Sequence, residues 1–398
     1  LAFVLLVGGG IYLKNKNGEV TALKVSEEKS INRYTMDVIF NDETKRIMCN
    51  QNVEYVNNTK TDLDKIYFHI YPNAFSKKEF APFEKNEMEQ AYPNGFNEGY
   101  IDMKNILNNG KKLEYEIKGD KNDILEVKLG RRLKPGEKFS IDMKYNVKLP
   151  NSEGRFGYGE STINVTNWFP ISCVNDDRGW NLKGYEKVGD PFYSDTSDFY
   201  VKILIPKKYK IGCTGNIINQ KSDNEKTLYE IQAKKVRDFA FVLSEKFDVY
   251  KDTYKNININ TYNLNKNLSK ESTKIAKESI KIFSELFGEY PYETYSVIAS
   301  DFYIGGMEYP MMVMIDQTLY NEKDKFLMEY VIAHETAHQW WYSVIGNDEI
   351  SEPWLDEALT EYSTVLYFEK KYGKEVGDKL IKTMEVQAKN RSSENIFK

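Results

Sequence analysis

The stretch His334-Glu335-Thr336-Ala337-His338 decides the fold of the second half of this chain and the chemistry it can carry. It contains two of the three histidines in the 398 residues. On a helix, residues i and i+4 share a face, so both imidazoles can reach one metal ion. Glu335, beside the first histidine, is then placed to polarise a water at that metal.

A metal site of this kind needs a third protein ligand. No histidine or cysteine follows His338, so a carboxylate must supply a ligand from the downstream chain. Glu357 stands on the next expected helix, one turn after Pro353, where an antiparallel neighbour would bring it back to the histidines. The pattern predicts one zinc ion bound by His334, His338 and Glu357, with one coordination position left open.

Two other glutamates compete for a role near this site. Glu352 lies at or before the start of the expected helix, which favours a solvated role. Glu361 shares a helix face with Glu357 at i+4. It either accepts a hydrogen bond from a ligand histidine or is an ordinary exposed carboxylate, and the sequence leaves both open. His69, far from the motif on an alternating strand, is predicted to be structural.

Composition places the chain among globular proteins of two or three domains. Hydrophobic residues make up 41% and aromatic residues 14% of the chain. The net charge is −5, from 55 basic and 60 acidic residues, so nothing suggests a nucleic-acid partner. The cysteines Cys49, Cys173 and Cys213 are odd in number and widely spaced, which favours buried thiols and leaves a single disulfide open.

The chain opens with Leu1 rather than Met and is apolar to Leu13. This run is shorter than the roughly 20 residues that span a bilayer. We interpret residues 1–16 as the remnant of a membrane anchor or signal, with a buried strand as the alternative. The expected location is membrane-anchored or extracytoplasmic, and a cytoplasmic one stays open. Residues 391–398 show no helix-stop signal, so the catalytic domain is expected to be incomplete there.

Residues 17–247 are predicted to form an N-terminal antiparallel β domain. Apolar and polar residues alternate along 34–40, 139–147 and 199–205, as in half-buried strands. Turn signals follow or precede these runs, such as Asn41-Asp42 and Pro135-Gly136.

Residues 248–398 are predicted to form a partial, mixed α and β catalytic domain. A strand at 256–264 is followed by a helix from Ser269 to Gly288 with Ala276, Ile280, Phe283 and Phe287 on its apolar face. A strand at 295–300 precedes a long helix over about 324–345, whose inward side is expected to carry Phe326, Tyr330, Ala337 and Trp341. The last expected helix starts near Ser351 and carries Leu355, Leu359, Tyr362 and Leu366.

The metal motif, the spacing to Glu357 and the segment Gly305-Gly306-Met307-Glu308 together resemble the gluzincin zinc aminopeptidases related to aminopeptidase N. Four upstream segments resemble the bacterial branch of that family: Tyr67 to Asn73, Trp168-Phe169-Pro170, Asp190 to Asp195 and Asp238-Phe239-Ala240. The resemblance therefore covers roughly residues 31–373. It implies an α+β multidomain fold, with the β domain followed by an incomplete thermolysin-like catalytic domain.

The resemblance also implies roles and partners. The substrates would be peptides with a free N-terminus, and Glu308 would pair with their α-amino group. Gly305, Gly306 and Met307 would line the substrate, with the glycines letting its backbone pass close as an added strand. Glu335 would act as general base and then protonate the leaving amine.

The chain departs from the family pattern at three places. Tyr309 and Pro310 follow Glu308 where Asn is commoner, and Trp341-Tyr342-Ser343 replaces the commoner Phe-Gly-Asn. The tyrosine that stabilises the oxyanion in the family would lie beyond Lys398, so that role is unassigned. These departures bear on the preference for substrate side chains rather than on the reaction type.

Three alternatives compete with a zinc aminopeptidase that removes N-terminal residues. One is a catalytically impaired peptide-binding or scaffolding relative, although such a protein has no chemical need for Glu335. Another is an endopeptidase or an epoxide-type hydrolase on the same zinc centre. The third is the peptidase portion of a larger membrane protein.

Overall fold

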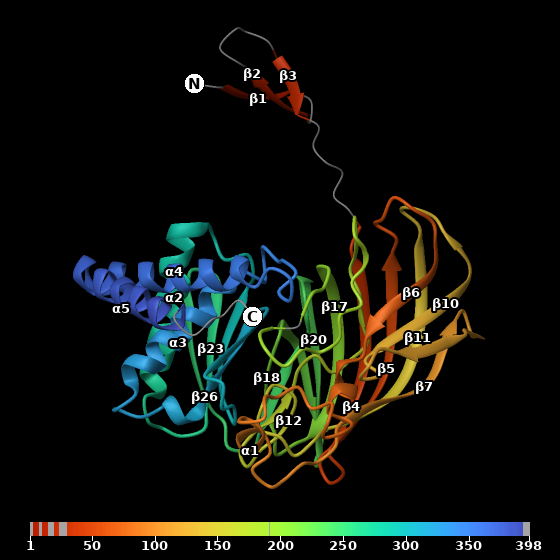
Figure 1. Ribbon diagram of the computed structural model, residues 1–398, viewed down its shortest axis with the longest axis horizontal. Helices are drawn as coiled ribbons and strands as arrows, with labels where there is room; N and C mark the ends of the chain where they lie inside the picture. Colours follow the sequence, from red (N-terminus) through yellow and green to blue (C-terminus); the bar gives the residue numbers. More distant parts are fainter. Residues whose placement is uncertain (1–2, 8–9, 15–19, 24–29, 191, 393–398) are drawn as a thin grey trace.

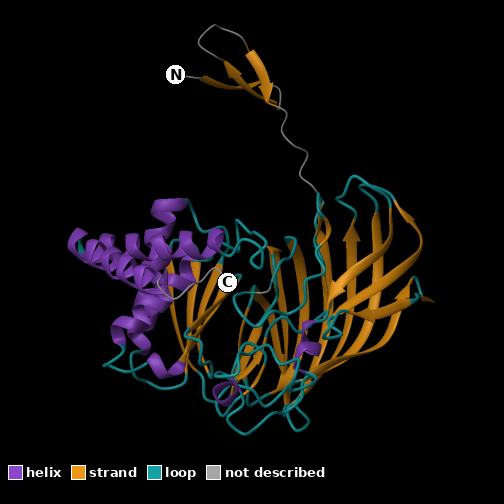
Figure 2. Ribbon diagram, in the orientation of Figure 1, coloured by secondary structure: helices purple, strands orange, loops and turns teal. Residues whose placement is uncertain are grey.

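The computed structural model describes residues 3–7, 10–14, 20–23, 30–190 and 192–392. A half built almost entirely of strands lies beside a half in which helices cover a sheet (Figures 1 and 2). The predicted fold class, an antiparallel β domain followed by a mixed α and β domain, is confirmed.

The first strands, β1 (Phe3–Val7), β2 (Gly10–Lys14) and β3 (Val20–Leu23), form a small antiparallel sheet. The segment 1–16, interpreted as a membrane-anchor or signal remnant, otherwise lies outside the described residues. None of the helices in the described ranges combines the length and apolar character that crossing a bilayer takes.

An eight-stranded sheet forms the body of the β half, in the order β19-β20-β17-β4-β5-β11-β7-β8. The predicted alternation is confirmed in β4, where Tyr34, Met36, Val38 and Phe40 are buried and their neighbours are exposed. The strands are β4 (Asn32–Asn41), β5 (Arg46–Val56), β7 (Tyr100–Asn108), β8 (Lys111–Lys112), β11 (Lys138–Lys148), β17 (Ser197–Pro206), β19 (Asn216–Ser222) and β20 (Lys226–Val236). Only β4 and β17 pair in parallel within this sheet.

Two four-stranded sheets enclose the core of this half. Cys49, Cys173 and Cys213 are buried free thiols, as predicted. One sheet contains β6 (Leu63–His69), β9 (Tyr115–Lys118), β10 (Ile124–Leu133) and β14 (Ile171–Ser172). The other contains β12 (Gly157–Tyr158), β13 (Ile163–Val165), β18 (Lys210–Cys213) and β21 (Phe241–Ser244). Short elements complete it: η1 (Tyr71–Phe75), α1 (Met88–Ala91), β15 (Asn175–Asp176) and β16 (Gly179–Trp180).

The second half is a five-stranded sheet in the order β22-β23-β24-β26-β25, with helices on one face (Figure 1). Its elements are β22 (Asp248–Tyr254), β23 (Ile257–Asn263), α2 (Ser269–Phe287), β24 (Thr294–Ser300), β25 (Gly306–Tyr309), β26 (Met312–Asp316), η2 (Gln317–Leu319), α3 (Lys325–Ala337), α4 (Trp354–Tyr372) and α5 (Lys374–Ser392). The helix predicted from Ser269 matches α2, and Ala276, Ile280 and Phe283 are buried as expected.

The two halves share one hydrophobic core. The face of the five-stranded sheet opposite the helices contributes Ile298, Met307, Tyr309, Met312 and Met314 to the same cluster as the β half. At Gly212 the strands approach so closely that a Cβ atom would lie 2.4 Å from Ile298 Cδ1. The sheets are therefore packed together rather than linked by a loose hinge.

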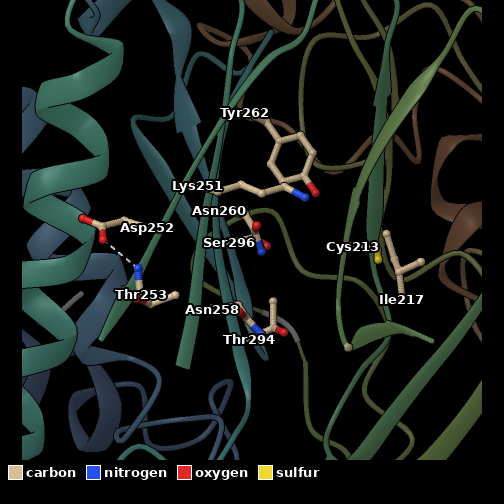
Figure 3. Close-up of a pocket in the computed structure, with 11 residues that line it drawn as sticks. Cys213, Ile217, Lys251, Asp252, Thr253, Asn258, Asn260, Tyr262, Thr294 and Ser296 are labelled. Atoms are coloured by element: carbon tan, nitrogen blue, oxygen red, sulfur yellow. Dashed lines mark hydrogen bonds between the residues drawn. The ribbon is translucent and has the colours of Figure 1, made fainter. Parts of the chain in front are cut away.

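Beside this contact the sheets diverge and leave a cleft of about 690 Å³. Cys213 and Ile217 line one wall, and side chains of β22, β23 and β24, including Asn260, Tyr262 and Ser296, line the other (Figure 3). None of the predicted site residues lies in it. Its lining of amides and hydroxyls explains why the sheets do not close over it, since these groups keep their water.

Two predictions for the helices were wrong. The helix expected over about 324–345 ends at Ala337, because His338 turns its Nδ1 to the carbonyl of Trp341 and Tyr342 takes a φ of +143°. On the same helix Ala337 is buried as expected, but Phe326, expected on the inward side, is 55% exposed. In α4, Leu359 and Tyr362 are 40% and 57% exposed. The buried residues of α4 are Asp356, Thr360, Ser363, Thr364, Val365, Tyr367 and Phe368.

Substituting Ile203 by Ala should destabilise the chain by about 2–5 kcal/mol, because its side chain is fully buried in the central strand β17. Chemical denaturation measures this change. Ile39→Ala on the adjacent strand β4, where the side chain is 39% exposed, is the control and should cost well under half as much. Equal losses would contradict the described register.

Candidate metal centre and its pocket

Helices α3 and α4 bring together the three residues predicted as metal ligands. His334 Nε2 lies 3.5 Å from Glu357 Oε2, and His338 Nε2 lies 4.0 Å from Glu357 Oε1. One donor atom from each of the three residues lies within 4.8 Å of the other two. The i, i+4 spacing on α3 turns both rings to one side, with ring centroids 5.0 Å apart.

The outer nitrogen of each imidazole has its own partner, which directs Nε2 toward Glu357. His334 Nδ1 lies 3.0 Å from Glu361 Oε2. His338 Nδ1 lies 3.0 Å from the carbonyl oxygen of Trp341 and 3.2 Å from Thr360 Oγ1. Of the two roles left open for Glu361, the geometry matches the contact with a ligand histidine.

This donor set fits zinc. Zinc prefers imidazole nitrogen and carboxylate oxygen, and donors on a tetrahedral ion at bond lengths of about 2.0–2.2 Å lie about 3.4 Å apart. The separations of 3.5 and 4.0 Å need only small shifts to reach this spacing. Glu357 occupies the first turn of α4, where the helix dipole favours a negative charge.

The protonation of the three residues reflects their mutual contacts. Burial lowers the pKa of His334, but Glu357 and Glu361 outweigh it and raise this pKa to about 10. Burial raises the pKa of Glu357, yet its contact with His334 brings the pKa down to about 2. Burial, together with the nearby His334, lowers the pKa of His338 to about 4. His334 therefore carries a positive charge between the carboxylates of Glu357 and Glu361, so the surroundings of this position favour a cation.

Glu335 lies beside the same centre and is buried. Burial raises its pKa to about 8 against the lowering effect of His334, a range suited to taking up and returning a proton near neutral pH. Strand β25 passes directly over it, since a Cβ atom on Gly306 would lie 2.2 Å from Glu335 Oε1. Any side chain at position 306 would therefore displace the Glu335 carboxylate.

Glu308 lines the same pocket, a cavity of about 270 Å³ that also contains the three donor residues and Glu335. Gly305, with φ +102°, and Met307 complete this stretch of wall. Strand β25 is the edge strand of its sheet, so its outer side is the one open to an added strand. Every residue predicted to contact substrate therefore lies at this pocket.

Sequence reasoning missed two pocket residues from the β half. Arg155 forms a close ion pair with Asp190, and its Nε lies 3.0 Å from Met307 Sδ. Asp190 lies within a segment that carried the family resemblance, but no local signal assigned it to the pocket. Neither residue has motif spacing, because both lie in loops between strands and reach the pocket only in the folded chain. His69, in contrast, is buried in β6 and stacks on Tyr71, as expected of a structural residue.

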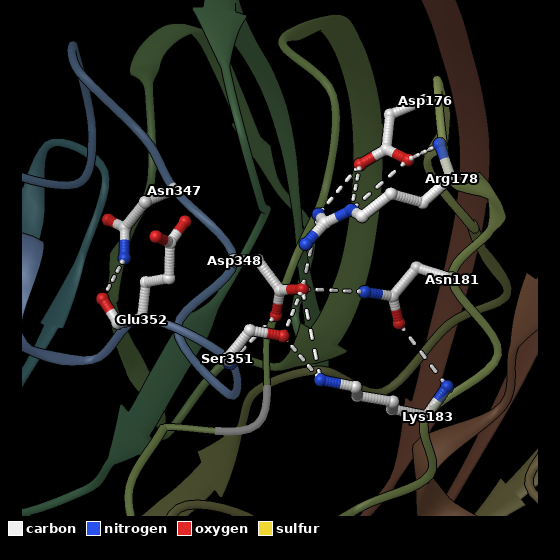
Figure 4. A network of polar contacts seen from close by, with 8 residues as sticks. All are labelled: Asp176, Arg178, Asn181, Lys183, Asn347, Asp348, Ser351 and Glu352. Carbon is white, nitrogen blue, oxygen red and sulfur yellow. Dashed lines mark hydrogen bonds and ion pairs between the residues drawn. The ribbon is translucent and has the colours of Figure 1, made fainter.

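The β half also holds the loop that connects the two helices of the metal centre. Asp348, which is buried, accepts from Asn181 Nδ2 at 3.1 Å and Ser351 Oγ at 2.7 Å (Figure 4). Arg178 Nη2 lies 3.4 Å from the same carboxylate. Arg237 Nε donates to the carbonyl oxygen of Tyr342 at 2.8 Å. The path from His338 to Glu357 thus depends on side chains of the other half.

Residues 271–396 match the family model Peptidase family M1 domain. This segment contains most of α2, the strand β25 and both helices of the metal centre. It covers about a third of the chain, and over that part the chain is similar to peptidase family M1.

Two kinds of relatives accompany this match. Over 90 residues the chain is 33% identical to Aminopeptidase B of Rattus norvegicus and of Homo sapiens, a stretch that covers 21% of this chain and 14% of those proteins. The M1 zinc metallopeptidase of Deinococcus radiodurans shares the fold, with a TM-score of 0.60 at 15% identity, over 90% of this chain and 74% of that one. A variant of it, crystallised with a Tyr-Ser-Ala substrate, matches with a TM-score of 0.60 at 14% identity over the same shares.

Replacing Glu361 by Gln should weaken zinc binding about 10- to 100-fold, because the amide no longer supports the basicity and orientation of His334. Competition with a chromogenic chelator measures the dissociation constant. Glu369→Gln, two turns further along α4, has no described contact with the centre and should leave it unchanged. Equal zinc affinity in Glu361→Gln and the unmodified protein would contradict the role of Glu361.

Proposed function

We propose that this protein is a zinc metallo-aminopeptidase that removes N-terminal residues from peptides. The observation that carries the proposal is the meeting of three metal donors, the buried Glu335 and the buried Glu308 in one pocket. The M1 domain match supports it, as do the aminopeptidase named among the relatives and the fold of a metallopeptidase crystallised with a peptide.

His334, His338 and Glu357 would hold the zinc ion. When bound, zinc supplies Lewis-acid chemistry, which polarises a carbonyl and acidifies water. Glu335 removes a proton from the attacking water and delivers it to the nitrogen of the departing peptide. A carboxyl with a pKa of about 8 can perform both transfers near neutral pH.

Glu308 would select substrates with a free N-terminus. Its carboxylate is buried, and its Oε1 lies 3.9 Å from Nδ1 of His338, an imidazole whose lowered pKa leaves it neutral. Burial, with Asp190 and Glu335 nearby, holds the pKa of Glu308 well above its usual range. An arriving α-ammonium group offsets this cost, so a peptide that brings one binds better than a blocked peptide.

The division into two domains extends the proposal: residues 17–247 support the site, and residues 248–398 carry the catalysis. The apolar run at 1–13 supports association with a membrane or export across it through residues 1–16. Detergent-free fractionation of cells that express the full chain tests this part. Recovery wholly in the cytosolic fraction would refute it.

Hydrolysis of an aminoacyl anilide and of its N-acetylated form by the purified chain tests the main proposal. The free substrate should be cleaved, the acetylated one should not, and a chelator should abolish the activity until zinc is restored. Cleavage of blocked peptides at internal bonds would favour an endopeptidase instead. Zinc binding without hydrolysis of any peptide would favour a peptide-binding relative.

Glu335→Gln should retain one zinc per chain and lose activity by about 10²- to 10⁴-fold, since the amide cannot carry the proton. Metal analysis and the anilide assay on the same sample measure both properties. Full turnover in this variant would remove Glu335 from the mechanism.

Glu308→Ala should reduce kcat/KM for the aminoacyl anilide by at least about 30-fold while zinc content stays the same, because the ammonium group loses a buried carboxylate. Steady-state kinetics measures the loss. Glu352→Ala is the matched control, because it makes the same change at an exposed glutamate outside the pocket and should leave the kinetics unchanged. Unchanged kinetics in Glu308→Ala would exclude the amine-binding role.

A further inference from the structure

Glu349 lies in the loop between α3 and α4, and no predicted role uses it. The residue is 3% exposed, and its Oε2 is buried without a hydrogen-bond partner among the described residues. A buried carboxylate in this condition is costly unless it is neutralised or meets a cation. The fold therefore keeps a buried acceptor here that its own side chains do not satisfy.

Glu308 is in the same condition and lies close by. Its Oε1 is buried without a hydrogen-bond partner, and one carboxylate oxygen each from Glu308, Glu349 and Asp356 lies within 4.8 Å of the other two. Asp356 has a weak partner, since Asn347 Nδ2 lies 3.4 Å from its Oδ1. Three buried carboxylates thus converge beside a pocket that Glu308 lines.

The nearby arginines do not neutralise this cluster. Arg155 is paired with Asp190. Arg237 directs its guanidinium to the carbonyl oxygens of Ser194, Tyr342 and Val344. In the described ranges, no lysine or arginine lies within ion-pair distance of Glu308, Glu349 or Asp356. The missing positive charge must then arrive with a ligand.

We propose that Glu349 is a second carboxylate for the α-ammonium group of the substrate, acting with Glu308. This inference rests on the proposed aminopeptidase function. An ammonium nitrogen donates three hydrogen bonds of about 2.8 Å, and a point about 2.8 Å from three oxygens fits a triangle with sides of 4.8 Å. Glu349 is thereby a binding residue that sharpens selection for free N-termini, with Asp356 adding negative charge beside it.

The test compares the zinc-loaded full chain with its Glu349→Gln and Glu352→Gln variants. The substrates are an aminoacyl anilide and its des-amino analogue, which keeps the acyl group but lacks the amine. Glu349→Gln should raise KM for the aminoacyl anilide about 30-fold and leave KM for the des-amino anilide within about twofold. Glu352→Gln makes the same change on an exposed residue of the same loop and should alter neither.

Stability and metal content separate this role from a structural one. Glu349→Gln should unfold at the same or a higher temperature, because it removes an unpaired buried charge, and should still bind one zinc. If Glu349→Gln unfolds at a lower temperature than the unmodified chain, Glu349→Asp is used in its place. Glu349→Asp is expected to raise KM for the aminoacyl anilide and not for the des-amino anilide. An equal effect on both substrates, or no effect on either, overturns the proposal.

Two further outcomes are decisive. Wild-type chain equilibrated with zinc, calcium and magnesium should contain one divalent ion. Two ions, with one lost in Glu349→Gln, would assign the carboxylate cluster to a metal and overturn the ammonium role. Wild-type chain inactive on every anilide would instead refute the proposed function itself, whereas active wild type with an unaltered Glu349→Gln would refute only the role of Glu349.

Discussion

The contact of His334 with Glu357 and Glu361 is the interaction on which the rest of the catalytic half depends. It joins α3 to α4, turns an imidazole toward the metal position and places a positive charge between two carboxylates. Tyr330 extends the contact by donating to Glu361 Oε1 at 2.6 Å. Because the first turns of α4 meet these polar contacts, their buried side chains are small or hydroxylated, whereas the large residues Tyr367 and Phe368 are buried nearer the end of the helix.

The pocket gathers more negative charge than its own arginines balance. Glu308, Glu335 and Glu349 are buried within it or beside it, and burial raises the pKa of each. A metal ion and a substrate ammonium group together supply the missing positive charge. The pocket is thereby prepared for two cationic groups, and it is lined by β25, α3, α4 and two loops of the β half.

Much of this arrangement was predictable from sequence, and the rest was not for identifiable reasons. Period-two alternation predicted the strands, and helical spacing with the His334 motif predicted which side chains meet. The end of α3 was missed because it depends on the contact of His338 with the Trp341 carbonyl, which no local pattern encodes. Arg155 and Asp190 reach the pocket, and Glu349 reaches Glu308 beside it, through tertiary packing, so no local sequence pattern marked them.

The continuous core between the two halves has a consequence for how this molecule behaves as a unit. Met307, Met312 and Met314 pack against residues of the β half, and Asp348 is bound by it. Heating should therefore melt both halves in one cooperative transition. An excised catalytic half would expose a methionine-rich sheet face to water, and it would tend to aggregate before it could assemble its active centre.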